Sequence, residues 1–194
     1  MVRIVLIRPG STDYDLQGRI QGNLDMPLAN EGLAEVAQTA EALRGLRLQA
    51  VHAPESQPAL QSAEIIADAL DIKLRKLDRL ANIDLGLWQG MLVADVCHKQ
   101  PKVYRQWEEQ PETVCPPEGE MLEQADERVR AALTKLVRRR KQGVIGVVLP
   151  EPLLSLARRF LTQCDLGDLW LPAVGRPRWE VLQVEPEALF AASR

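Results

Sequence analysis

The residues best placed for chemistry follow the first strand-like segment of the chain. Val2–Ile7 is rich in β-branched residues and is closed by Arg8-Pro9-Gly10. This pattern is typical of a buried strand that delivers a loop at its carboxyl end. Loops in that position carry function in α/β folds. Because an arginine donates charged hydrogen bonds, Arg8 is a candidate ligand for an anion.

The chain contains two histidines, so any mechanism that needs a histidine must use one of them. His52 closes an expected strand over residues 50–52, which predicts a place at the carboxyl edge of the sheet, near the loop after Ile7. It is therefore a candidate nucleophile or base, or else a strand-end histidine bonded to a loop. His98 lies beside Cys97, but adjacent helix residues point in different directions, so this pair indicates a metal only weakly.

Composition limits the kind of protein. A length of 194 residues allows one domain or a domain with a small cap, and 46% hydrophobic with 26% charged residues is typical of a globular chain. A net charge of −3 offers no general attraction for nucleic acid or an acidic membrane. No stretch approaches the ~20 apolar residues of a membrane span. We expect a cytoplasmic protein that binds neither nucleic acid nor membrane.

The three cysteines, Cys97, Cys115 and Cys164, are odd in number and have no C-x-x-C spacing. This argues against a disulfide framework, a structural zinc site or a redox pair. We expect idle thiols and no bound metal or cofactor.

Apolar spacing alternates between strand and helix periods along the chain. Helices are predicted over residues 30–44, 59–70, 120–140 and 153–161, and strands over 2–7, 50–52, 72–77, 144–149 and 179–184. A polar, partly helical segment begins at Met91. The alternation predicts a single α/β domain over residues 1–194, with a helical cap inserted at about 91–118.

Several local motifs occur together in a recognisable order. They are Arg8-Pro9-Gly10, Gly18–Leu28, Glu31-Gly32, Gln61–Ala67, Leu85-Gly86-Leu87-Trp88-Gln89-Gly90 and Pro117-Glu118-Gly119-Glu120 with Arg128. In this order the chain resembles the histidine phosphatase superfamily, which includes the cofactor-dependent phosphoglycerate mutases. The resemblance implies a three-layer α/β/α fold around a mostly parallel central sheet.

The catalytic positions of that family hold other residues here. The family's nucleophilic histidine in an R-H-G loop corresponds to Pro9, its second phosphate-binding arginine to Pro58, its acid to Asn82 and its second histidine to Pro150. Proline cannot attack phosphorus, and an amide has no transferable proton at neutral pH. We therefore expect a catalytically inactive member of the family, a pseudoenzyme with a binding or regulatory role.

Such a protein would bind an unknown protein partner or a small phosphorylated ligand, and a homodimer is allowed. The candidates for weak phosphate binding are Arg8, Gly10, Gln21, Gly22 and Asn82. Two acids, Asp15 and Glu151, oppose a phosphoryl group, and Arg8 could instead form an ion pair with one of them.

Two alternatives stay open. One is a phosphatase or phosphotransferase with altered chemistry, which uses His52 or an acid such as Asp13 while Arg8 holds the anion. The other is a fold kept for assembly, in which the tryptophans supply core or interface surface. These are Trp88, Trp107, Trp170 and Trp179.

Overall fold

A five-stranded sheet forms the centre of the molecule. The computed structural model describes residues 1–138, 140, 142–170 and 177–185. The strands lie in the order β3-β2-β4-β1-β5, and only β5 runs antiparallel to its neighbour. Their bounds are β1 Val2–Ile7, β2 Ala50–Ala53, β3 Lys73–Lys76, β4 Gly143–Val148 and β5 Trp179–Val184.

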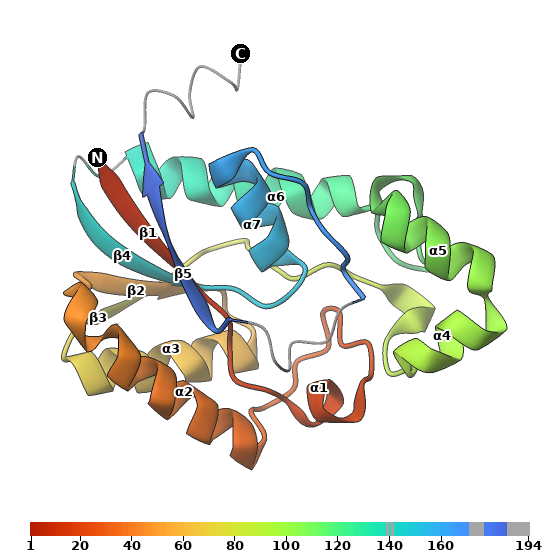
Figure 1. Cartoon of the computed structure of the whole chain (residues 1–194), viewed down its shortest axis with the longest axis horizontal. Helices are drawn as coiled ribbons and strands as arrows, with labels where there is room; N and C mark the ends of the chain where they lie inside the picture. Colours follow the sequence, from red (N-terminus) through yellow and green to blue (C-terminus); the bar gives the residue numbers. More distant parts are fainter. Residues whose placement is uncertain (139, 141, 171–176, 186–194) are drawn as a thin grey trace.

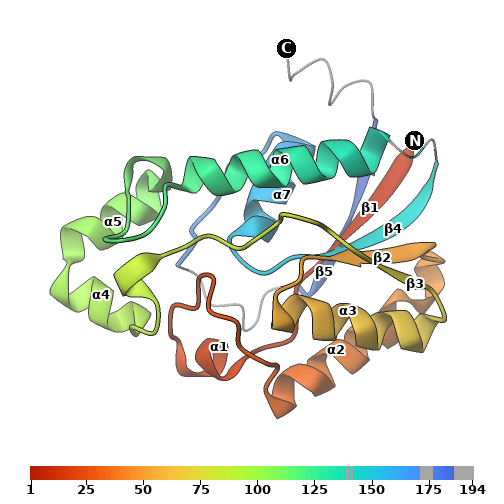
Figure 2. The same ribbon diagram turned by 180° about the vertical axis from the view of Figure 1, so that it is seen from behind.

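Helices cover both faces of this sheet, as Figures 1 and 2 show from opposite sides. One face carries α2 (Asn30–Leu43) and α3 (Gln57–Leu70), and the other carries α6 (Leu122–Arg138) and α7 (Leu153–Thr162). The short helices α1 (Asp13–Gln17), α4 (Val93–Lys99) and α5 (Pro101–Glu109) lie beyond the carboxyl ends of the parallel strands. The predicted three-layer α/β/α fold is confirmed.

The alternation of β1 explains why it lies in the interior. Ile4 and Leu6 belong to the core that contains α6 and α7, whereas Val5 and Ile7 belong to the core beneath α2 and α3. All four side chains are fully buried. A strand covered on both faces reads as a continuous apolar run, and its carboxyl end delivers Arg8 to a fixed place.

Two elements begin later than predicted, because the backbone amides at their expected starts donate hydrogen bonds outside the element. Strand β3 begins after Ile72, because the Ile72 amide donates to the Ala67 carbonyl at the end of α3. Helix α6 begins at Leu122 rather than at Glu120, because the Glu120 amide donates to Asp84. None of the described helices is both long and apolar enough to cross a bilayer.

An aromatic cluster joins α4 and α5 to the body of the fold. Trp88 packs edge-on against Trp107 with ring centroids 5.4 Å apart, and Trp170 lies 5.6 Å from Trp88. Tyr104 stacks on Trp170 at 5.0 Å, and its carbonyl accepts a hydrogen bond from Trp170 Nε1. Three of the four tryptophans are therefore core residues, while Trp179 is only partly buried on β5.

Candidate active site

A cavity of about 400 Å³ opens where β1 and β4 end. The segments that follow these strands, Arg8–Ser11 and Pro150–Pro152, line it together with the loop around Asn82. Ligands of open α/β sheets bind at the carboxyl ends of the strands, so this is the expected place for a site. The four positions that the resemblance assigns to catalysis, Pro9, Pro58, Asn82 and Pro150, converge here.

All five predicted anion-binding candidates line this cavity. They differ in whether their hydrogen-bond donors are already used within the protein. The Gly10 amide donates to Ser62 Oγ at 3.0 Å. Gln21 accepts from Thr12 Oγ1 and donates to the Leu24 carbonyl. These polar groups already have partners inside the protein, so they fix the loops that surround the cavity.

Asn82 connects three segments of the cavity wall. Its Nδ2 donates to the Gly22 carbonyl at 2.8 Å and to the Glu151 carbonyl at 3.0 Å, while its Oδ1 accepts from the Ile83 amide. The side chain is buried, and both of its donor hydrogens are used. Its hydrogen bonds hold backbone in place and leave no donor for a ligand.

Arg8 is the candidate that keeps donor capacity. Its Nη1 contacts Glu151 Oε1 at 2.8 Å, and the side chain is only 6% exposed. Its Nε is buried and has no hydrogen-bond partner among the described residues. The ion pair with one of the two nearby acids, which the sequence left open, is therefore present, and the acid is Glu151.

The two acids of the cavity wall are held differently. Glu151 Oε2 accepts from the Ser155 amide at 3.1 Å, while Oε1 faces Arg8. Asp15 belongs to the capping box of α1, in which Thr12 is the N-cap and Asp15 Oδ2 accepts from the Thr12 amide at 2.8 Å. Asp13 is exposed and does not line the cavity, so the structure does not bring this alternative acid to the site.

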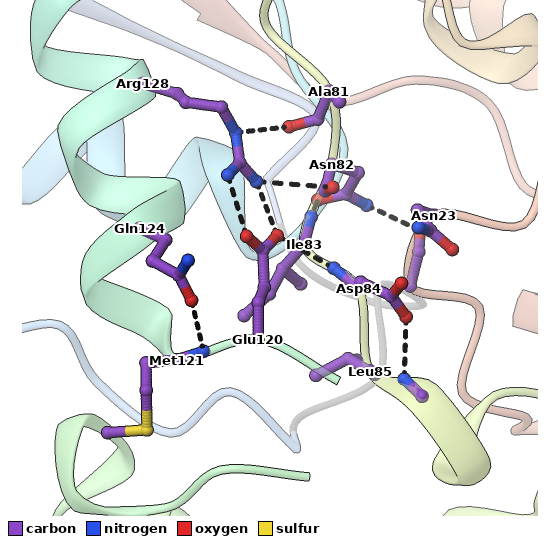
Figure 3. Close-up of polar contacts among 12 residues, drawn as sticks. Asn23, Ala81, Asn82, Ile83, Asp84, Leu85, Glu120, Met121, Gln124 and Arg128 are labelled. Atoms are coloured by element: carbon purple, nitrogen blue, oxygen red, sulfur yellow. Dashed lines mark hydrogen bonds and ion pairs between the residues drawn. The ribbon is translucent and has the colours of Figure 1, made fainter. Parts of the chain in front are cut away.

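A second ion pair supports the loop that carries Asn82 (Figure 3). Arg128 on α6 holds both carboxylate oxygens of Glu120 at 2.6 and 2.8 Å, and its guanidinium also donates to the Ala81 and Asn82 carbonyls. Glu120 Oε1 accepts from the Asp84 amide as well. Burial raises the pKa of Glu120, but the hydrogen bonds from Arg128 and Asp84 outweigh it and place the pKa below its usual range.

His52 does not lie at the cavity, so its predicted position is wrong. Strand β2 continues to Ala53, and Val51 faces the α2 and α3 core, so His52 points to the opposite face. Its Nε2 lies 3.4 Å from Arg140, which joins α6 to β4 at the amino end of that strand. Burial, with Arg140 and Arg75 nearby, lowers the His52 pKa to about 4.

His98 is exposed on α4 and does not line the cavity either. Within the described part of the chain, no three His, Cys, Asp or Glu side chains are grouped as metal ligands would be. The described cavity lining contains no histidine.

Sequence reasoning missed two groups of residues at this site. Trp107 and Trp170 line the cavity, although their spacing along the chain gives no signal of this. Arg178 forms an ion pair with Glu35 and donates to the Pro9 carbonyl, while Glu35 accepts from the Ser11 amide and hydroxyl. These contacts depend on how β5 and α2 pack around the loop after β1.

Several known proteins are similar to this chain in sequence or in structure. The chain is 29% identical over 185 residues to phosphoserine phosphatase 1 of Hydrogenobacter thermophilus, which covers 95% of this chain and 88% of the relative. It is 31% identical to a probable phosphoglycerate mutase of an Enterobacter species, across 69% of this chain and 62% of the mutase. A solved mycobacterial glucosyl-3-phosphoglycerate phosphatase superposes with a TM-score of 0.79 at 25% identity, over 95% of this chain and 98% of that one.

These relatives contradict the expectation that the chain is not an enzyme. Phosphoserine phosphatase 1 and the mycobacterial phosphatase each match 95% of this chain, and their names point to an enzyme rather than to a pseudoenzyme.

A sequence model of one protein family matches nearly the whole chain. The sequence model of the histidine phosphatase superfamily (branch 1) matches residues 4–192. The matched region includes the strands of the sheet and every loop described above as part of the cavity wall. The chain therefore belongs to the histidine phosphatase superfamily.

Proposed function

We propose that this protein is a phosphatase that hydrolyses a phosphate monoester in the cavity at the carboxyl ends of β1 and β4. The observation that carries the proposal is the similarity to named phosphatases, which extends over 95% of the chain and so includes the segments that form the cavity. A volume of about 400 Å³ accommodates a small organic ester rather than phosphate alone.

Arg8 is the residue that we propose to bind the phosphoryl group. It is buried at the end of β1, where rigid packing fixes its position, and its Nε has no partner among the described residues. A phosphate dianion carries more charge than the single carboxylate of Glu151, and charged hydrogen bonds from arginine to phosphate are strong. The substrate would therefore compete with Glu151 for the guanidinium.

The residue that activates the attacking group is not His52, because that ring does not line the cavity and contacts Arg140 instead. Asp15 is the better candidate: it lines the cavity, and its described hydrogen bonds engage Oδ2 rather than Oδ1. We propose that Asp15 Oδ1 accepts a proton from water. The water oxygen forms a bond to phosphorus, the bond from phosphorus to the ester oxygen breaks, and the departing oxide takes a proton from solvent, so that inorganic phosphate and an alcohol are released while Asp15 returns its proton to solvent.

Release of inorganic phosphate from a panel of monoesters tests this function. We expect Arg8→Gln to lower kcat/KM by about 100-fold or more, the scale for loss of one charge-stabilising donor. Asp15→Asn keeps an oxygen that can cap α1, so we expect a loss in kcat of about 10²–10⁴ with phosphate binding retained. Arg44→Gln, which alters an exposed ion pair on α2, serves as the control.

Absence of phosphate release from every ester by the purified wild-type protein would overturn the proposal. Release that is unchanged in Arg8→Gln would show that the reaction takes place elsewhere, and would overturn the assignment of this cavity.

A further inference from the structure

One part of the cavity lining is apolar. Leu92 and Val93 reach it from the start of α4, Trp107 from α5, and Leu169 and Trp170 from the segment after α7. These elements lie beyond the carboxyl edge of the sheet in Figures 1 and 2, whereas Arg8 directly follows β1. The cavity therefore has a polar end for a phosphoryl group and an apolar wall for the rest of the ester.

The tryptophans of this wall are rigidly held. Trp107 and Trp170 have ring centroids 6.0 Å apart, and the stacked Tyr104 and the Trp170 Nε1 hydrogen bond fix the second ring. Trp107 and Trp170 are only 3% and 8% exposed, so they fix the position of the wall from behind and present little surface of their own.

The charged side chains of the described lining balance one another. Arg19 is the cation of the described lining besides Arg8, and its Nε and Nη1 already donate to Gln17 and to the Gly90 carbonyl. The acids of the described lining are Asp15 and Glu151, and Glu151 is paired with Arg8. With no surplus of positive charge among these side chains, the apolar wall favours an uncharged group over an amino acid or a glycerate.

The chemistry of the leaving group points the same way. Asn82, at the position where the family resemblance implies an acid, has both of its amide hydrogens bonded to backbone carbonyls. An alkoxide needs a proton as it departs, and a missing general acid costs about 10²–10⁴ in rate. An aryl oxide is a much weaker base, so it departs without that proton.

We propose that the substrate is an aryl phosphate monoester, with its ring against the apolar side chains of Leu92, Val93 and Leu169 and its phosphoryl group at Arg8. This assignment rests on the proposed phosphatase function and narrows it to one class of ester. It differs from the esters that the names of the matched relatives describe.

Three esters separate the two parts of the argument. Phenyl phosphate and benzyl phosphate are both apolar but differ in the basicity of the leaving oxygen, and O-phosphoserine adds charge. We expect kcat/KM to fall at least 10-fold from phenyl to benzyl phosphate, through kcat, because the benzyl oxygen needs a proton. A further fall of at least 10-fold is expected for O-phosphoserine, through KM.

Binding measured without turnover tests the apolar wall directly. Phenylphosphonate, which is not hydrolysed, should bind about 10-fold more tightly than methylphosphonate in a calorimetric titration. Leu92→Asn should remove most of this difference. Leu92 is half-buried at the cap of α4, and asparagine is favoured at helix caps, so the variant should fold. Leu87→Asn, at a residue that is 58% exposed and outside the cavity, is the matched control.

The possible outcomes test the aryl ester assignment and the phosphatase function separately. Faster release from O-phosphoserine than from phenyl phosphate would overturn the aryl assignment and leave the phosphatase function standing. Equal binding of the two phosphonates would overturn the role of the wall. Failure to hydrolyse any ester would overturn the phosphatase function itself.

Discussion

Two arginine–glutamate ion pairs lie close to the cavity and differ in how completely each is bonded. Arg128 and Glu120 share two hydrogen bonds, and Arg128 also reaches two carbonyls of the loop before Asp84. Arg8 meets Glu151 through a single nitrogen, and its Nε has no described partner. The first pair lies outside the cavity, and the second lines it.

The difference in hydrogen bonding indicates a structural role for the Arg128–Glu120 pair and a ligand-binding role for the Arg8–Glu151 pair. A bidentate pair with further hydrogen bonds is strong and geometrically specific, and it leaves little capacity for a ligand. A buried guanidinium with an unused hydrogen-bond donor can still gain stabilising hydrogen bonds from a ligand. The Arg128 pair holds the Asn82 loop in place, and the Arg8 pair is the one that a phosphoryl group can exchange.

The Arg128 pair is expected to matter most for stability. Arg128→Met leaves Glu120 facing the loop without its cation and removes the hydrogen bonds to Ala81 and Asn82. Charged hydrogen bonds contribute about 1.5–3 kcal/mol each, and breaking a buried pair costs more. Since both side chains are partly exposed, we expect the free energy of unfolding in urea to fall by about 3 kcal/mol.

Arg44→Met is the matched control, because Arg44 and Glu41 form an exposed pair on α2. Exposed pairs contribute about 0–1 kcal/mol. A loss at Arg128 no larger than the loss at Arg44 would show that the loop does not depend on the pair.

The sequence predicted the scaffold well because its signals are local. The β-branched run of β1 and the apolar stripe of α2 each specify an element, and the motif around Arg8 specifies the loop that follows β1. The side-chain pairings at the site are not local. Arg128 reaches Glu120 and the Asn82 loop only because α6 packs beside them, and Trp170 reaches the cavity from 63 positions beyond Trp107.

His52 shows that the position of a residue along a strand does not by itself predict a functional role. The prediction placed His52 at the carboxyl end of β2 and did not consider the face to which its ring points. Val51 and Ala53 belong to the core under α2 and α3, so the alternation of β2 turns the His52 ring to the opposite face, where Arg140 lies. Arg140 thus lies beside His52 and disfavours its protonated form. We expect this contact to affect how the stability of the protein depends on pH.

The folded His52 has a pKa of about 4, below the value of about 6.5 in an unfolded chain. As pH falls from 6.5 to 4, the unfolded state takes up a proton that the folded state does not, so stability is lost in this window. Between pH 7 and pH 5 this loss is about 2 kcal/mol. His52→Gln should remove that share of the fall, measured by urea unfolding at both pH values.

His98→Gln, on the exposed surface of α4, is the control and should retain the wild-type difference between the two pH values. A His52→Gln variant with the full wild-type fall would mean that acid destabilisation arises at other groups.

The smallest expected effect is the most direct test of the comparison between the two pairs. Glu151→Gln keeps a side chain of similar size but removes the charge that competes for Arg8. Inorganic phosphate should then bind about 5-fold more tightly, a gain of about 1 kcal/mol for one charged contact that is partly exposed to solvent. Calorimetry with phosphate measures this gain.

The matched change at the other pair is Glu120→Gln, which should leave phosphate affinity unchanged, because Glu120 does not line the cavity. If Glu151→Gln binds phosphate no better than the wild-type protein, the Arg8 pair is as fixed as the Arg128 pair. Arg8 would then be a structural residue, and the phosphoryl group would have to bind through other donors.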